Sequence, residues 1–143
     1  MTKYNMRSLP ERSDNSMNYR HAFHAGSFAD VIKHIVLVRM LTYLQEKQAP
    51  FRVIDTHAGA GLYDLTSSEA QRGGEWLTGI ARLMQARLSD KAQPLIGPYL
   101  DIVRAFNPRG ELKAYPGSPL IARALLRPQD RLTRSEEHTS ELQ

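Results

Sequence analysis

The chain has 143 residues, of which 41% are hydrophobic, with no cysteine and a formal net charge of +4. The absence of cysteine excludes a disulfide framework and a thiolate metal site, and it fits the reducing cytoplasm in which we expect the protein to act. The longest apolar run, residues 35–41, is interrupted by Arg39, which excludes a membrane span, and the first residues lack the apolar segment of a secretory signal.

The first sixteen residues are polar and show no periodicity. We interpret residues 1–16 as a disordered extension or a mis-start, with Met17 as the more natural first residue.

A helix is predicted to begin after Gly26, because Ser27 and Asp30 form an S-x-x-D capping box. The apolar residues that follow recur at helical spacing, and the helix should extend to about Lys47. These residues are Val31, Ile35, Val38 and Leu41.

A buried strand is predicted in "APFRVIDTH", residues 49–57, with Phe51, Val53 and Ile54 as its apolar core. The strand ends at Asp55 and leads into Ala58-Gly59-Ala60-Gly61. Glycines in such a turn let the backbone reverse sharply and approach a ligand closely.

Residues 62–113 have a different character, with two segments of helical apolar spacing separated by a polar turn. We expect a helical insertion between two parts of an α/β core. The periodic residues are Trp76, Ile80 and Leu83 in the first segment, and Tyr99, Ile102, Val103 and Phe106 in the second. At the end of this region, "ELKAY", residues 111–115, is a possible short strand. A helix then follows, with Ser118 as N-cap and Pro119 at its first position.

The last ten residues, "RSEEHTSELQ", have no apolar periodicity and reverse the local charge. They match one reading frame of a common sequencing adapter, so we interpret residues 134–143 as an artefact and expect the natural protein to continue differently. Without them, 18 basic and 12 acidic residues remain, and the net charge is +6.

Three cofactors compete for the glycine turn. A phosphate loop would need Gly-Lys-Ser/Thr, but Leu62 and Tyr63 follow Gly61. A dinucleotide site would need G-x-G-x-x-G, and Asp64 stands at the third glycine position. S-adenosylmethionine fits the strand-D-x-x-x-G-x-G pattern, while a tight turn without a ligand stays open as an alternative.

Four histidines outside the last ten residues lie within a 37-residue window: His21, His24, His34 and His57. His21 and His24 have H-x-x-H spacing, but no nearby Asp/Glu–His pair completes a zinc pattern, so we expect no metal site. His34 follows the apolar spacing of its helix, and spacing alone favours a hydrogen-bonded core residue.

Three segments together, "YRHAFHAGSFADVIKH", "IDTHAGAGLYDL" and "YPGSPLIARALLRPQDRL", resemble the RlmJ family of 23S ribosomal RNA adenine-N6 methyltransferases. The resemblance extends from Met17 to about Leu132. It implies a Rossmann-like α/β core with a helical insertion, truncated in this chain, and S-adenosylmethionine as the cofactor. The implied organisation is 17–61 for the N-terminal motif, first helix and cofactor loop, 62–113 for the insertion and 114–133 for continuation of the core.

The resemblance also implies roles for residues at matching positions. Family contacts to S-adenosylmethionine fall on His34, His57 and Ser118, with Asp55 and Gly59 shaping the same pocket. Family positions near the RNA fall on Tyr19, His21 and Lys33. The insertion would extend the RNA-binding surface, with candidate phosphate contacts at Arg72, Arg82, Arg87 and Arg104.

One family motif is absent from this sequence. Adenine-N6 methyltransferases carry Asp-Pro-Pro-Tyr, or Asn-Pro-Pro-Tyr, whose first residue holds the exocyclic amine, and here prolines occur only singly. We therefore expect no catalytic residue within this chain and no methyl transfer by it. The family's ribose-binding acidic residue falls on Glu136, inside the adapter-like segment, where we judge the match coincidental.

The resemblance therefore predicts that the chain is a fragment of a cytoplasmic, monomeric, metal-free methyltransferase acting on an adenine N6 of 23S ribosomal RNA. Two alternatives stay open. One is a non-catalytic RNA-binding module, and the other is a DNA adenine-N6 methyltransferase with the same pocket.

Overall fold

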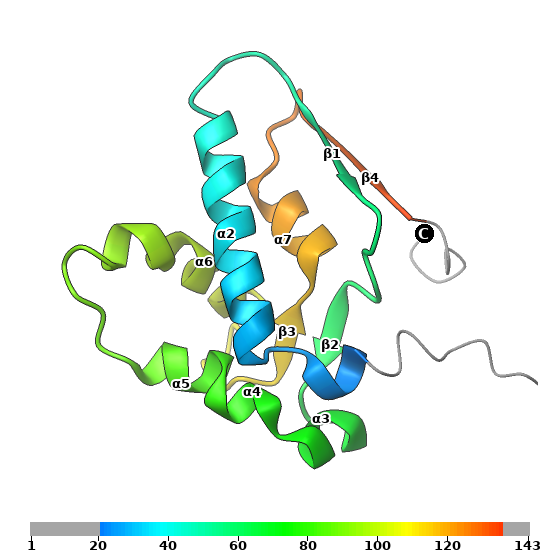
Figure 1. Ribbon diagram of the computed structural model, residues 1–143, viewed down its shortest axis with the longest axis vertical. Helices are drawn as coiled ribbons and strands as arrows, with labels where there is room; N and C mark the ends of the chain where they lie inside the picture. Colours follow the sequence, from blue (N-terminus) through cyan, green and yellow to red (C-terminus); the bar gives the residue numbers. More distant parts are fainter. Residues whose placement is uncertain (1–20, 136–143) are drawn as a thin grey trace, which may run out of the picture.

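The computed structural model describes residues 21–135, and Figure 1 shows how their helices and strands are arranged. The long helix α2, Phe28–Leu44, stands beside α7, Ser118–Leu125, and α6, Gln93–Ala105. Three short helices cross below it: α3, Ser68–Gly73, α4, Glu75–Thr78, and α5, Ile80–Gln85. Within residues 21–135, no helix has the length and hydropathy needed to cross a membrane.

The strands form two separate pairs. Strand β1, Arg52–Asp55, pairs in parallel with β4, Arg131–Arg134, and Val53 lies opposite Leu132. Strand β2, Leu62–Asp64, pairs antiparallel with β3, Ala114–Pro116. Helix α7 leads from β3 into β4, so the parallel pair is completed by a helical crossover typical of α/β proteins.

The predicted start of the long helix is confirmed. The hydroxyl of Ser27 accepts a hydrogen bond from Asp30 N, and the carboxylate of Asp30 accepts one from Gly26 N at 3.2 Å. The reciprocal bond of a capping box thus reaches one residue further back than usual. The helix ends at Leu44, three residues before the predicted end.

The core lies between α2, α6 and the β2–β3 pair. Tyr99, Val103 and Tyr115 are fully buried there, together with Val38 from α2 and Ile80 from α5. Apolar positions that the sequence assigned to separate helices therefore meet in one core.

The prediction of a buried strand at residues 49–57 is wrong in part. Val53 is half-buried on the side that α7 covers, whereas 68% of the surface of Ile54 is exposed. Parallel strands are normally covered on both faces, which explains why this apolar sequence misled the prediction. Among residues 21–135, no second layer covers the face that carries Ile54.

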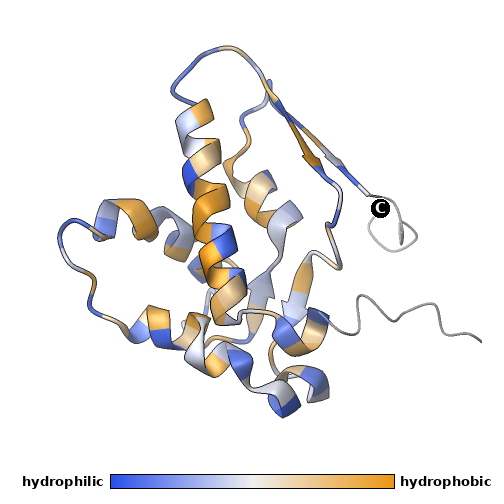
Figure 2. Ribbon diagram, in the orientation of Figure 1, coloured by the Kyte–Doolittle hydropathy of each residue, from blue (hydrophilic) through white to orange (hydrophobic). Residues whose placement is uncertain are grey.

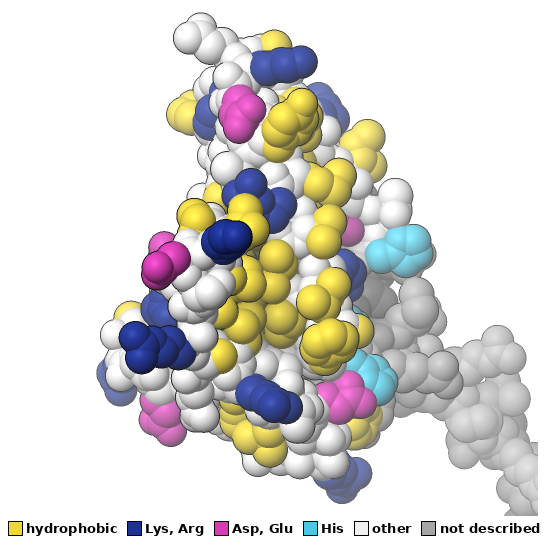
Figure 3. Space-filling model, turned by 60° about the vertical axis from the view of Figure 1, so that its left-hand side comes forward, with side chains coloured by type: hydrophobic (Ala, Val, Ile, Leu, Met, Phe, Trp, Pro, Cys, Tyr) yellow, Lys and Arg dark blue, Asp and Glu magenta, His cyan; other side chains and the backbone are white. Residues whose placement is uncertain are grey.

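Helix α2 also exposes apolar side chains on the face away from α6 and α7. Figure 2 shows hydrophobic residues on successive turns of the α2 ribbon, and Figure 3 shows hydrophobic side chains gathered down one face of the molecule. The exposed residues of α2 include Phe28, Ile32, Val36 and Met40. A helix that is apolar on all sides is typical of one buried on all sides.

Residues 62–113 contain the predicted helical segments, but the first is broken in two at Gly79. Ile80 N donates to Gly26 O at 2.9 Å, so the backbones of these segments cross in direct contact. A Cβ atom on Gly79 would lie 2.1 Å from Gly26 O, so only glycine allows this approach.

Candidate functional site

A cavity of about 280 Å³ lies where the carboxyl end of β1 meets α2 and the start of α7. Apolar side chains, among them Leu37, Val53 and Ala122, line part of it. Its polar residues come from three separate segments of the chain: Lys33, His34, Asp55, Thr56, His57 and Ser118. Five of these six were predicted as site residues from the sequence, and Thr56 was not.

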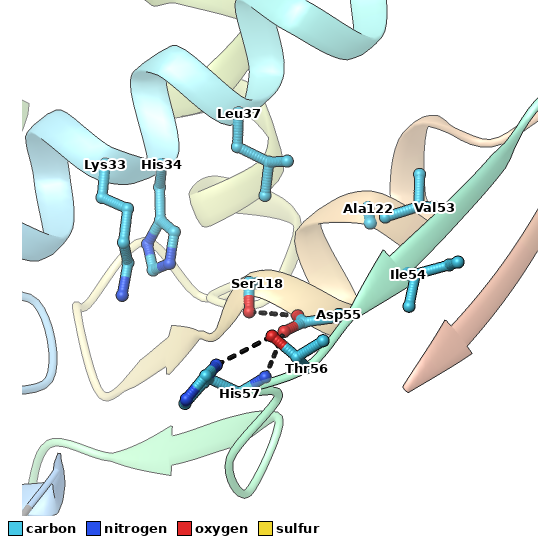
Figure 4. Close-up of a pocket in the computed structure, with 10 residues that line it drawn as sticks. All are labelled: Lys33, His34, Leu37, Val53, Ile54, Asp55, Thr56, His57, Ser118 and Ala122. Atoms are coloured by element: carbon cyan, nitrogen blue, oxygen red, sulfur yellow. Dashed lines mark hydrogen bonds between the residues drawn. The ribbon is translucent and has the colours of Figure 1, made fainter. Parts of the chain in front are cut away.

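Asp55 connects the end of β1 to the beginning of α7. One carboxylate oxygen accepts a hydrogen bond from His57 N at 3.1 Å, and the other accepts the hydroxyl of Ser118 at 2.5 Å. Both oxygens are thus engaged within the protein, and Asp55 fixes the positions of its two neighbours in the cavity wall (Figure 4).

The prediction that Ser118 caps α7 is corrected by the structure. Gly117 is the N-cap, no side chain bonds to the first turn, and Ser118 is the first helical residue. Because the Ser118 hydroxyl donates to Asp55, it is committed across the cavity and does not satisfy the N–H groups of its own helix.

The glycine turn lies beside the cavity but does not line it. Gly59 and Gly61 have φ values of +64° and +85°, which other residues rarely adopt. Ala60 N donates to the hydroxyl of Tyr63 at 3.3 Å, and a Cβ on Gly59 would lie 2.5 Å from that hydroxyl. Gly59 therefore allows the turn to fold over Tyr63. His57, just before this turn, lies in the cavity wall.

His34 is both a core residue and a cavity residue. Only 1% of its surface is exposed, and burial lowers its pKa from 6.5 to about 4, so the ring is neutral at physiological pH. Its Nδ1 atom lies 2.7 Å from the hydroxyl of Tyr115. The ring is thus held from behind while its other edge is on the side of the cavity.

Asp30 is a charged group close behind the cavity. Its carboxylate lies 3.1 Å from His21 Nε2 and 3.4 Å from Lys33 Nζ. Burial would raise its pKa, but the hydrogen bond and charge of His21, with the nearby charges of His34 and Lys33, hold the pKa below its usual value. Lys33 is therefore tethered at the cavity rim by a carboxylate beneath it.

The other predicted residues are placed differently. His21 pairs with Asp30 and lies 5.0 Å from the ring of Tyr63, outside the cavity lining. Tyr19 and Glu136 lie outside the described residues, so their roles stay predictions. Arg104 forms an ion pair with Asp101 on its own helix.

The H-x-x-H pair does not converge on one point. His21 contacts Asp30, whereas His24 contacts Glu75 at 2.9 Å. Within residues 21–135, no three His, Cys, Asp or Glu side chains are grouped to hold a metal ion.

Sequence reasoning missed the residues behind the cavity. Asp30 was read only as a helix cap, and Tyr115 only as part of the strand before Ser118. Tyr63 was used only to reject a phosphate loop. The available signal was the concentration of polar residues in otherwise apolar segments, because buried polar groups require partners.

Comparisons with known proteins show the family to which the chain belongs. A family model described as "Ribosomal RNA large subunit methyltransferase D, RlmJ" matches residues 48–143. The match includes the adapter-like residues 134–143, and their origin stays a prediction.

Two curated proteins with the name Ribosomal RNA large subunit methyltransferase J are similar to the chain. That of Escherichia coli K12 is 50% identical over 125 residues, covering 87% of this chain and 44% of the relative. That of Haemophilus influenzae is 45% identical over 127 residues, with the same two shares of 87% and 44%. The chain thus spans less than half the length of either relative.

A solved structure has a similar fold. The crystal structure of protein LPL1258 from Legionella pneumophila superimposes with a TM-score of 0.67 at 41% sequence identity. The superposition covers 78% of this chain and 39% of that protein.

Proposed function

Because the chain belongs to the RlmJ family of ribosomal RNA large subunit methyltransferases, we propose that it forms the cofactor-binding part of such an enzyme. The proposed cofactor is S-adenosylmethionine, and the proposed core is Rossmann-like. The complete enzyme would act as a monomer in the cytoplasm on an adenine N6 of 23S ribosomal RNA. This chain contains no Asp-Pro-Pro-Tyr motif, so we propose that it binds the cofactor without transferring the methyl group.

One observation carries the proposal. Four predicted cofactor residues, distributed from position 34 to position 118, line one cavity at the carboxyl end of a parallel strand. They are His34, Asp55, His57 and Ser118. In α/β folds, ligands bind outside the carboxyl ends of the strands, and here the first residue of α7 also lines that place.

The chemistry of the cavity fits this ligand. The bound cofactor would supply an electrophilic methyl group on a sulfonium, and its amino acid part carries a carboxylate. Lys33 places a positive charge at the rim, and the first turn of α7 provides backbone N–H groups, both of which favour a negatively charged group.

The size of the cavity also fits a partial site. At about 280 Å³ it is just below the range of about 300–1,000 Å³ typical of ligand pockets. The exposed face of β1 adjoins it, so further chain packed on that face would deepen it.

Calorimetric titration of the 143-residue chain with S-adenosylhomocysteine tests the proposal. We expect saturable binding that Asp55→Asn weakens about tenfold or more, because this change disturbs the bonds to His57 and Ser118. Asp101→Asn is the matched control, since Asp101 is exposed on α6 and away from the cavity.

The same titration distinguishes the proposed function from a non-catalytic RNA-binding module. A folded chain that binds ribosomal RNA but not S-adenosylhomocysteine would contradict the proposal and favour a non-catalytic RNA-binding module. Circular dichroism of each protein shows whether it is folded before the titration.

A further inference from the structure

Three buried side chains form a line from the insertion to the cavity. The hydroxyl of Tyr99, on α6, lies 2.8 Å from the hydroxyl of Tyr115, on β3. The hydroxyl of Tyr115 lies 2.7 Å from Nδ1 of His34, on α2. Neither tyrosine has any exposed surface, and only 1% of His34 is exposed.

Burial raises the pKa of both tyrosines, so each keeps its proton at physiological pH. Burial also keeps His34 neutral, with one N–H. Each hydroxyl therefore has one hydrogen to donate, and His34 can donate from Nδ1 or from Nε2.

Only one arrangement gives both hydroxyl hydrogens an acceptor among residues 21–135. If Tyr99 donates to Tyr115 and Tyr115 donates to Nδ1 of His34, both hydroxyls are satisfied and His34 carries its hydrogen on Nε2. If Nδ1 instead donated to Tyr115, one of the two hydroxyl hydrogens would have no acceptor among residues 21–135. The first arrangement leaves only the Nε2–H of His34 without a partner among these residues, and Nε2 is not one of their fully buried unpaired atoms. Leaving the hydrogen of a fully buried hydroxyl unpaired is costly, so the first arrangement is favoured.

The Nε2 edge of His34 is on the cavity side. His34 lines the cavity, its Nε2 has no hydrogen-bond partner among the described residues, and Figure 4 shows the ring beside Lys33, pointing toward Ser118 and His57. An N–H donor next to a lysine favours an anionic acceptor and disfavours a cationic donor such as an ammonium group.

We propose that Tyr115, oriented by Tyr99, is a positioning residue that holds neutral His34 with an Nε2–H donor aimed at the carboxylate of the ligand. The identity of the ligand as a compound with an adenosyl group and an amino acid part rests on the proposed function. The geometry assigns a specific task to the insertion, because Tyr99 lies on α6 and reaches the cavity only through Tyr115 and His34.

The test combines a spectrum with a pair of ligands. Two-bond ¹H–¹⁵N correlation spectra of the 143-residue chain, labelled at histidine, report whether each ring nitrogen of His34 is protonated and whether the other accepts a hydrogen bond. Titrations use S-adenosylhomocysteine, which has the carboxylate, and 5′-methylthioadenosine, which has the same adenosine and thioether without the amino acid part.

In the unaltered chain, we expect a protonated Nε2 and an unprotonated, hydrogen-bonded Nδ1. Tyr115→Phe should move the Nδ1 signal toward that of a free lone pair, and Tyr99→Phe should move it less in the same direction, because it only weakens the donor. Tyr115→Phe should also weaken the binding of S-adenosylhomocysteine about three- to tenfold and leave the binding of 5′-methylthioadenosine unchanged. Tyr43→Phe, at an exposed position on the same helix as His34, should change nothing.

Two results would overturn the inference: a protonated Nδ1 in the unaltered chain, or a Tyr115→Phe variant that affects both ligands equally or neither. Should the unaltered chain bind neither compound, the proposed function fails together with the carboxylate role. The Nδ1 signals would in that case still decide whether Tyr115 positions His34. The spectrum of the unaltered chain requires no variant to fold.

Discussion

Acidification should destabilise this fold through a single buried histidine. The pKa of His34 is about 4 in the folded protein, against 6.5 for an ordinary histidine, because burial penalises the charged ring. Below pH 6.5 the unfolded chain therefore binds a proton that the folded chain does not, and stability falls as the pH falls. The loss begins near pH 6.5 and is complete near pH 4, where the folded protein also binds the proton.

The size of this loss follows from the two pKa values. Each pH unit between the two pKa values lowers the free energy of unfolding by about 1.4 kcal/mol. Protonation of His34 alone should therefore lower it by on the order of 3 kcal/mol between pH 7 and pH 4. That is a large share of the stability of a small domain, about 5–15 kcal/mol. The pKa of about 4 already includes the effects of the charges on Asp30, Lys33, His21 and Asp55.

Urea unfolding at a series of pH values measures the effect. The comparison is with His34→Asn, which keeps an acceptor near the position of Nδ1 for the hydroxyl of Tyr115 but cannot be protonated. The variant should be less stable at pH 7 and should lose less stability than the unaltered chain on acidification to pH 4. Parallel curves for the two proteins would refute the reasoning, because they would show that His34 does not link folding to protonation.

Three further predictions concern the fold and its acid sensitivity. Gly79→Ala should destabilise the fold by about 3 kcal/mol or more, because its Cβ would meet Gly26 O, whereas Gly97→Ala inside α6 has room and should stabilise it by up to about 1 kcal/mol. Urea midpoints measure both changes, and equal effects would argue against the backbone crossing. Replacing the exposed Ile32 and Val36 of α2 by lysine should change the unfolding free energy by only about 0.5 kcal/mol and reduce self-association measured by sedimentation; a large destabilisation would show that this face is covered. The carboxylate of Asp130 accepts hydrogen bonds from Arg127, which lower its pKa from 3.8 to about 2. The contribution of Asp130 to stability should therefore be lost only as the pH falls below about 4 toward 2. In the same urea series, Asp130→Asn should abolish this loss.

Local features of the fold could be predicted because a few adjacent residues determine them. Ser27 and Asp30 fixed the start of α2 through bonds within one helical turn. The glycine turn was recognised from the spacing of Gly59 and Gly61, and both residues have positive φ values in the structure. Both cases depend on contacts between residues close in sequence.

The pairing of the strands depends on distant partners, and β2 and β4 were not predicted. Strands β2 and β4 have three and four residues and exist only because β3 and β1 lie alongside them. Helical spacing placed Trp76 and Ile80 on one helix, but the chain is broken between them by the approach of Gly26. For His34, spacing favoured a core residue, and its burial confirms this. The cofactor contact that the resemblance implies stays a prediction, although His34 also lines the cavity.

The position of Tyr99 changes how the insertion should be understood. If residues 62–113 only extended an RNA-binding surface, their buried residues could be any apolar set that packs against α2. Instead, the packed face of α6 includes a hydroxyl that completes a hydrogen-bond chain to His34. A phenylalanine at position 99 would fill nearly the same volume without this bond, so packing alone does not account for the tyrosine. Tyr99 thus reaches the cavity only through Tyr115 and His34, and we expect its replacement to alter ligand binding without touching the ligand.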